Sequence, residues 1–184
     1  MIRPIYLYGS EVLREKAAEA DLSKKEELSA LVADLWETLA SSEGCGLAAP
    51  QIGVSQRVCV VDGDIMADVY PYLKGFKRTF INPVIVEASP EQSTYNEGCL
   101  SVPGIYCDVQ RPSKIKVEYY DAELQKQCEE FDKFAARMIQ HEFSHLDGVL
   151  FTDLVAPIRR KLLVGKLQRI SAGKVGTRYK SRIK

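Results

Sequence analysis

Both histidines of the chain fall within one five-residue segment, HEFSH at residues 141–145. In a helix, residues four apart lie one turn apart on the same face, so His141 and His145 can bind one metal ion. Glu142 is then placed as a general base toward water at that ion, as in the H-E-x-x-H motif. The segment also fits a metal-free helix with two surface or core histidines. The remaining sequence has to discriminate between these two interpretations.

Length and composition indicate a single globular domain over residues 1–184. Apolar residues make up 46% and charged residues 27%, which excludes disordered and fibrous proteins. No stretch approaches the roughly 20 apolar residues of a membrane helix, and the N-terminus does not resemble a signal peptide. The five cysteines form no disulfide framework, so we expect free thiols, a cytoplasmic location and no membrane contact.

Charge is distributed unevenly, although the net charge is zero. No acidic residue follows Asp153, whereas ten lysines and arginines lie between Arg159 and Lys184. A basic C-terminal helix and tail, about 157–184, can contact a polyanion such as RNA. The simpler interpretation is a solvated amphipathic helix followed by a frayed terminus.

Apolar periodicity predicts an α+β fold. Strands are expected at 57–61, 78–87, 92–99, 114–121 and 125–131. Because they follow one another without intervening helices, we expect antiparallel β-sheets packed around a central helix that carries the H-E-x-x-H segment. N-terminal helices and a C-terminal helix complete the predicted fold.

Helix boundaries follow from capping residues. Ser23 and Glu26 have the spacing of a capping box that opens a helix ending before Gly44, and a shorter helix is expected after Ser10. The histidine helix is expected to begin near Asp132, with Gly148 as its C-terminal cap. The last helix begins near Pro157 and ends at Gly173, and the tail beyond it is expected to be mobile. Its predicted apolar stripe comprises Ile158, Leu162, Leu163, Leu167 and Ile170.

A catalytic metal site usually has three protein ligands, so a third ligand is needed. Position 151 is Phe where one class of metalloprotease has a third histidine, and no Glu follows Glu142. Cysteine is then the best remaining type. Cys99, at the end of a predicted strand next to Gly98, is the first candidate, and Cys45 in a glycine-rich loop is the second. A structural zinc site is disfavoured because no C-x2-C pair exists.

Three segments together resemble the signature motifs of the peptide deformylase family, in the same order. They are GCGLAAPQIG at 44–53, EGCLS at 97–101 and QHEFSHLDG at 140–148. Their span and the chain length are similar to those of bacterial members. Ser144 departs from the pattern, since the family usually has Asp there. That position faces away from the metal in a helix, so we expect a changed local hydrogen bond rather than lost activity.

The resemblance implies a ligand set and a reaction. Cys99, His141 and His145 would bind one divalent metal ion, usually Fe²⁺ in the family, with Zn²⁺, Ni²⁺ or Co²⁺ also accepted. The reaction would remove the formyl group from the N-terminal formyl-methionine of newly made polypeptides in a bacterial cytoplasm. We expect the protein to be a monomer.

The resemblance also implies roles for individual residues. Glu142 would act as general base and then general acid, while the side-chain amide of Gln51 and the backbone N–H of Leu100 would stabilise the oxyanion. Glu97 and Arg111 would pair and support the site from behind the ligands. The substrate would lie against Gly44, Cys45, Gly46 and Ile139.

Two other functions remain open on sequence grounds. One is a metallo-endopeptidase, which would cleave unformylated peptides internally. The other is a metal-stabilised RNA-binding module that uses the basic C-terminus. For an enzyme acting on nascent chains, the same basic segment 159–184 predicts a contact with ribosomal RNA.

Overall fold

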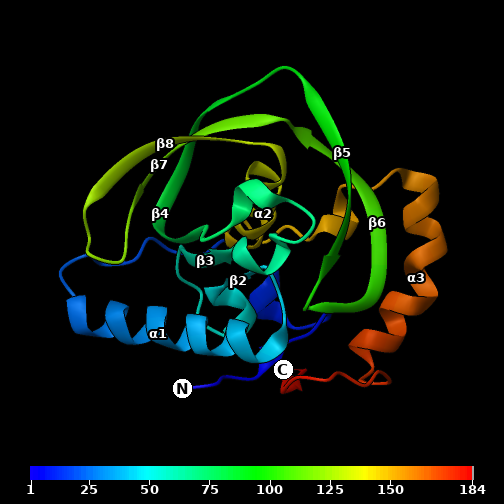
Figure 1. Cartoon of the computed structure of the whole chain (residues 1–184). Coiled ribbons are helices and arrows are strands. Elements are labelled where there is room, and N and C mark those ends of the chain that lie inside the picture. The colour runs from blue at the N-terminus through cyan, green and yellow to red at the C-terminus, as the bar shows by residue number, and fades with distance from the viewer. Residues whose placement is uncertain (184) are drawn as a thin grey trace.

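The computed structural model describes residues 1–183 and contains three α-helices, two antiparallel sheets and a short parallel pair within that range. The larger sheet has the strand order β2-β3-β4-β7-β8 and is antiparallel throughout (Figure 1). Its strands are β2 (Gly46–Ala48), β3 (Val58–Asp62), β4 (Lys77–Ala88), β7 (Lys114–Tyr120) and β8 (Lys126–Asp132). The predicted antiparallel sheets are confirmed.

Helix α2 (Lys133–Leu146) lies at the centre, with the larger sheet on one side and the hairpin of β5 (Gln92–Cys99) and β6 (Val102–Pro112) on the other (Figure 1). The small side chains of Ala135 and Ala136 are buried on this helix. They let α2 approach β2 and β3 closely. The histidine segment is therefore held inside the protein rather than on its surface.

Strand β3 is buried on both faces, and its side chains alternate between two apolar clusters. Cys59 and Val61 pack toward the cluster that includes α2, whereas Val58 and Val60 pack toward the cluster that includes α1 (Lys25–Ser42). This alternation follows from the two-residue period of a strand. It explains why the segment is a continuous apolar run.

Helix α3 (Pro157–Ser171) covers the outer face of the hairpin, but its predicted apolar stripe is correct for only three of five residues. Leu163, Leu167 and Ile170 are buried against β6, whereas Ile158 and Leu162 are exposed by 74% and 71%. A helix turns by about 100° per residue, so 158 and 162 lie on a different side from the other three. The five residues do not form one stripe.

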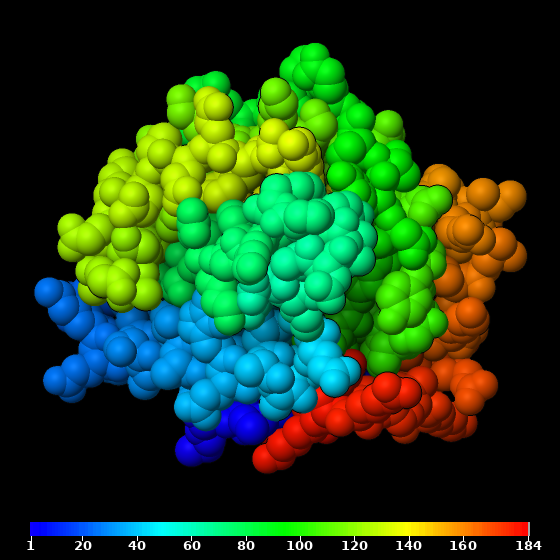
Figure 2. Space-filling view, viewed as in Figure 1, coloured from blue at the N-terminus to red at the C-terminus, as the bar shows by residue number. Residues whose placement is uncertain are grey.

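The C-terminal tail was expected to be mobile, and within residues 174–183 this prediction is wrong. Strand β9 (Ser181–Arg182) pairs in parallel with β1 (Ile5–Tyr6), so the chain end returns to the N-terminus. In Figure 2 the tail (red) lies along the lower edge, near the end of α1 (cyan) and the hairpin (green). Its backbone hydrogen bonds depend on a partner more than 170 residues away, which local periodicity does not reveal.

Smaller differences concern caps and one strand. The predicted capping box fails because Ser23 Oγ donates to Asp21, and α1 begins one residue later than that box requires. The helix expected after Ser10 is a three-residue 3₁₀ turn, Glu11–Leu13. Strand β6 was not predicted, since Pro and Gly near its start are poor strand formers.

Across the described residues, no helix combines the length and apolarity needed to cross a bilayer.

Phe80 tests the central core. Its side chain is fully buried and contacts the rings of Tyr119, Phe131 and Phe143. The substitution Phe80→Ala should lower the free energy of unfolding by about 3–5 kcal/mol, because it removes buried area and leaves a cavity. Val84→Ala, on the exposed part of the same strand, should change it by under about 0.5 kcal/mol. Urea titrations of both variants measure the difference, and similar losses would contradict this account of the core.

Candidate metal centre and active site

Three potential metal ligands converge beside α2. The Sγ atom of Cys99, at the end of β5, lies 3.2 Å from Nε2 of His145. The ligand atoms of Cys99, His141 and His145 all lie within 4.8 Å of one another. The helix supplies two of them because of their four-residue spacing. The strand supplies the third at a register shift between Glu97 and Cys99, which changes the direction of the chain end.

Glu97 fixes the orientation of His141. Its Oε2 lies 2.9 Å from His141 Nδ1, so the Nε2 atom of that ring is left for the ligand cluster. Arg111 donates two hydrogen bonds to the Glu97 carboxylate, at 2.8 and 3.1 Å, and Arg137 donates another at 2.8 Å. Burial acts to raise the pKa of Glu97, but the hydrogen bonds from His141 and Arg111 hold that pKa well below its ordinary value. Glu97 is therefore a buried, charged anchor.

The electrostatics of the cluster favour a cation. Burial lowers the pKa of His145 well below its ordinary value, so its ring is neutral and free to coordinate. Burial also acts to lower the pKa of His141, yet its hydrogen bonds to Cys99 and Glu97 raise that pKa to about 10. A positive charge is thus favoured between the thiol and the carboxylate. One thiolate and two imidazoles suit Zn²⁺, Fe²⁺, Co²⁺ or Ni²⁺, and the residues present fit such an ion.

Glu142 lies on α2 next to these ligands and lines a cavity of 740 Å³. Its side chain is buried, and Oε2 has no hydrogen-bond partner among the described residues. Burial raises the pKa of Glu142 to about 7. A Cβ atom at Gly46 would overlap Glu142 Oε1, so only glycine at that position of β2 leaves room for the carboxylate.

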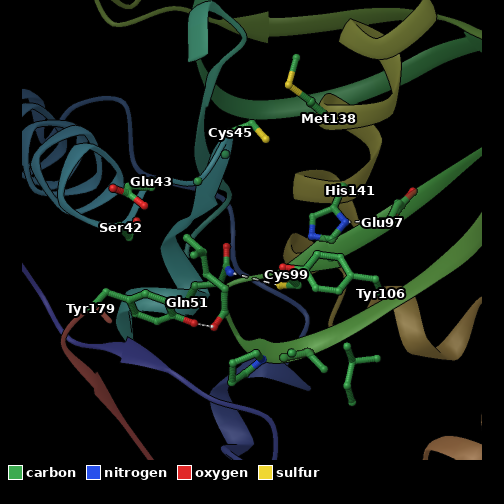
Figure 3. A pocket seen from close by; sticks show the side chains of 18 of the residues that line it. Ser42, Glu43, Cys45, Gln51, Glu97, Cys99, Tyr106, Met138, His141 and Tyr179 are labelled. Atoms are coloured by element: carbon green, nitrogen blue, oxygen red, sulfur yellow. Dashed lines mark hydrogen bonds and ion pairs between the residues drawn. The ribbon is translucent and has the colours of Figure 1, made fainter. Parts of the chain in front are cut away.

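Gln51 and Leu100 also line the cavity, and Figure 3 shows Gln51 beside Cys99. The Oε1 atom of Gln51 accepts a hydrogen bond from the backbone of Ala48 at 2.9 Å, which fixes the side-chain amide. Its Nε2 donates to Ser101 Oγ at 3.1 Å and lies 3.6 Å from Cys99 Sγ. The amide is therefore held facing the ligand cluster.

Most of the predicted substrate-contacting residues line the cavity, but one does not. Gly44, Cys45 and Gly46 are part of its wall. Ile139 is not, because its side chain is fully buried in the core. Met138, one residue earlier in the helix, takes the expected place (Figure 3). The prediction for Ile139 is wrong by one helical position, which corresponds to a rotation of about 100°.

Cys45 is not part of the ligand cluster. It lines the cavity, and burial raises the pKa of its thiol to about 11. Of the two cysteines considered as third ligand, the structure brings only Cys99 to the histidines. Cys45 instead contributes an uncharged side chain to the cavity wall.

The departure at Ser144 has a local structural consequence. Arg111 Nη1 donates to Ser144 Oγ at 2.8 Å, and that hydroxyl is 2.9 Å from the carbonyl oxygen of Gln140. The hydroxyl thus satisfies one face of the guanidinium without adding a charge. It lies on the side of α2 that faces β6, and it is not among the ligand atoms.

Several cavity residues were missed by sequence reasoning. Arg137 is buried on α2, and the signal for it was a charged residue among apolar ones in a central helix. The ring of Tyr106 lies over Gly98, where a Cβ would lie 2.5 Å from it. Four tail residues also line the cavity, and no local sequence pattern predicted this. They are Gly176, Thr177, Arg178 and Tyr179.

Neutralising Glu97 tests whether this carboxylate anchors the site. In Glu97→Gln, the buried Arg111 and Arg137 lose their shared anion, so the free energy of unfolding should fall by about 3–5 kcal/mol. Glu87→Gln, which removes an exposed carboxylate paired with Lys116, should leave the urea midpoint unchanged. Equal midpoints for the wild type and both variants would contradict the anchoring role.

Comparison with known proteins agrees with this geometry. A family model described as polypeptide deformylase matches residues 2–161. The peptide deformylase of Cytophaga hutchinsonii is 40% identical, over 98% of this chain and 96% of its own length. The crystal structure of peptide deformylase from Thermus thermophilus has a TM-score of 0.83 at 36% identity, covering 94% of this chain and 99% of that one. The structure of a peptide deformylase from Legionella pneumophila has a TM-score of 0.81 at 34% identity, covering 95% and 98%. The chain therefore belongs to the polypeptide deformylase family, whose members are hydrolases acting on N-formyl peptides.

Proposed function

We propose that this protein removes the formyl group from the N-terminal formyl-methionine of newly made polypeptides, using one divalent metal ion held by Cys99, His141 and His145. The observation that carries the proposal is the meeting of these three ligands with an unpartnered buried carboxylate, Glu142, at one cavity. Family membership favours this reaction over internal peptide cleavage and over an RNA-binding role.

Cys99, His141 and His145 would hold the ion, which would supply Lewis-acid chemistry at the formyl carbonyl and at water. We propose Fe²⁺ as the ion in the cell, with Zn²⁺, Ni²⁺ and Co²⁺ also accepted. The mixed thiolate and imidazole donor set supports this group of ions, while disfavouring hard cations such as Mg²⁺. Glu97 and Arg111 hold His141 in the orientation that the site requires.

Glu142 is the proposed general base. Its carboxylate borders the cavity, which His141 also lines, and there it can accept a proton from the water that attacks the formyl carbon. The same group then donates that proton to the departing amine. Glu97, the other buried carboxylate that lines the cavity, is engaged by His141 and two arginines.

The oxyanion formed at the formyl carbon needs hydrogen-bond donors. The Gln51 amide carries two hydrogens, of which one serves Ser101 and the other lies on the Cys99 side. We assign that second hydrogen and the backbone N–H of Leu100 to the oxyanion. A preorganised donor of this kind contributes about 2.7–4 kcal/mol of transition-state stabilisation.

The methionine side chain would occupy the apolar end of the cavity. Cys45, Met138 and Phe134 form its wall and carry no charge there. The peptide that follows would pair with the backbone at Gly44 and Gly46, in the manner of an added strand. The wall is tightly packed at Gly44, where a Cβ would meet Leu100 at 2.7 Å.

The predicted contact with ribosomal RNA stays a proposal. It is supported by five basic side chains of α3, all of which are exposed. They are Arg159, Arg160, Lys161, Lys166 and Arg169.

The variant Glu142→Gln tests the proposed base. Because it removes the proton acceptor but no ligand, release of formate from a formyl-Met-Ala peptide should fall by at least about 100-fold, while the metal content stays at one ion per chain. Glu87→Gln serves as the matched control and should retain full activity. Turnover by Glu142→Gln near the wild-type rate would refute the assignment. Internal cleavage of unformylated peptides by the wild type would favour the endopeptidase.

The variant Cys99→Ala tests the ligand set. After reconstitution with Co²⁺ and gel filtration, it should retain less than about a tenth of the metal bound by the wild type, since one of three protein ligands is lost. Cys128→Ala, at an exposed cysteine, should bind cobalt as the wild type does. Elemental analysis gives both values. Full metal content in Cys99→Ala would show that this thiol is not a ligand.

A further inference from the structure

The C-terminal tail contributes one wall of the proposed catalytic cavity. Gly176, Thr177, Arg178 and Tyr179 line it together with Leu100 and Gly44. The Tyr179 side chain points toward the EGCLS segment, and its hydroxyl donates a hydrogen bond to the carbonyl oxygen of Leu100 (Figure 3). This part of the chain lies beyond residues 2–161, the range that the family model matches.

The tail is held in place by contacts of its own. The backbone N–H of Ile5 donates to Lys180 at 2.8 Å, and that of Leu7 donates to Arg182 at 2.9 Å. The Thr177 hydroxyl donates to the carbonyl of Tyr179 at 2.7 Å, which closes a turn. The position of Tyr179 is therefore set in part by β1 and by this turn.

The Tyr179 ring is packed against apolar side chains next to the cavity. It lies against the apolar cluster between α1 and the larger sheet, and Leu100 packs against the same cluster. Burial raises the pKa of its hydroxyl above the ordinary value, so the group stays protonated and remains a donor. The hydroxyl is thus a fixed donor aimed at one carbonyl.

The carbonyl of Leu100 and the N–H of Ser101 belong to a single planar peptide group. The Tyr179 hydroxyl donates to the oxygen of that peptide group. The N–H of the same group, which belongs to Ser101, points to Cys99 Sγ, with nitrogen and sulfur 3.4 Å apart. Rotation of the peptide plane would move both ends together. The hydrogen bond that fixes the Leu100 carbonyl oxygen therefore also keeps the Ser101 N–H directed at the Cys99 sulfur.

We propose that Tyr179 is a positioning residue for the metal ligand Cys99. Its hydroxyl fixes the Leu100–Ser101 peptide, which keeps an N–H donor on the sulfur and the thiolate aimed at the ion. Hydrogen bonds to a ligand atom set its orientation and its donor strength. The inference rests on the proposed function, because it deepens the role of the same site. It makes the tail a part of the catalytic structure.

The substitution Tyr179→Phe removes the hydroxyl and keeps the ring. Tyr120→Phe is the matched control, because Tyr120 packs against the same apolar cluster but does not line the cavity. Both variants and the wild type are loaded with Co²⁺. We then compare kcat and KM for a formyl-Met-Ala peptide, the thiolate-to-cobalt absorption band, and the urea midpoint.

Tyr179→Phe should lower kcat by about three- to tenfold, the change expected for one hydrogen bond. KM should stay within about twofold. The thiolate-to-cobalt band should shift from its wild-type position, and Tyr120→Phe should match the wild type in all three values. A band or a kcat equal to that of the wild type would overturn the proposal. So would a lower urea midpoint accompanied by an unmoved band, because the role would then be structural alone.

The two proposals fail in different ways. A wild-type cobalt protein that releases no formate would refute the proposed function. The absorption band does not depend on turnover, so the response of Cys99 to Tyr179→Phe would still be measured in that case.

Discussion

The buried carboxylate of Glu97 joins the parts of the site to one another. It receives Arg111 from β6, and Arg137 and His141 from α2, while its own strand ends two residues later at Cys99. A lone buried carboxylate would be costly, and three cationic or donating partners offset that cost. The same contacts connect the hairpin to the central helix. The orientation of one proposed metal ligand and the location of another are thus set by a single ion cluster.

The enclosure of α2 has a second consequence for the chemistry. Because both sheets surround the helix, the H-E-x-x-H segment is removed from bulk water, except at the cavity. Burial raises the pKa of Glu142 and lowers that of His145, so the carboxylate accepts protons more readily and the imidazole stays neutral. The close contact between Glu142 and Gly46 shows how tightly β2 is packed against the helix at this point. The packing that stabilises the domain also tunes the groups proposed to act.

The tail connects the ends of the chain to the site. Strand β9 pairs with β1, and Tyr179 reaches the carbonyl of Leu100, so both termini support the loop that follows Cys99. Residues far apart in sequence are brought together here by backbone pairing and one side-chain hydrogen bond. The exposed basic side chains of α3 are separate from this wall, because α3 packs on the outer side of the hairpin. The basic residues of the C-terminal part therefore lie in two different places, on α3 and in the tail beside the cavity.

Local spacing along the chain predicted the antiparallel fold and the paired histidines, and the resemblance to the deformylase motifs implied Cys99 as the third candidate ligand. The four-residue interval of His141 and His145, the EGCLS segment at Cys99 and the period of the strands carried that information. Other features became evident only in the folded chain. Met138 rather than Ile139 borders the cavity, Leu162 faces outward, and the tail is ordered within the described residues. This division arises because periodicity defines which residues share a face, whereas what that face packs against depends on partners distant in the chain.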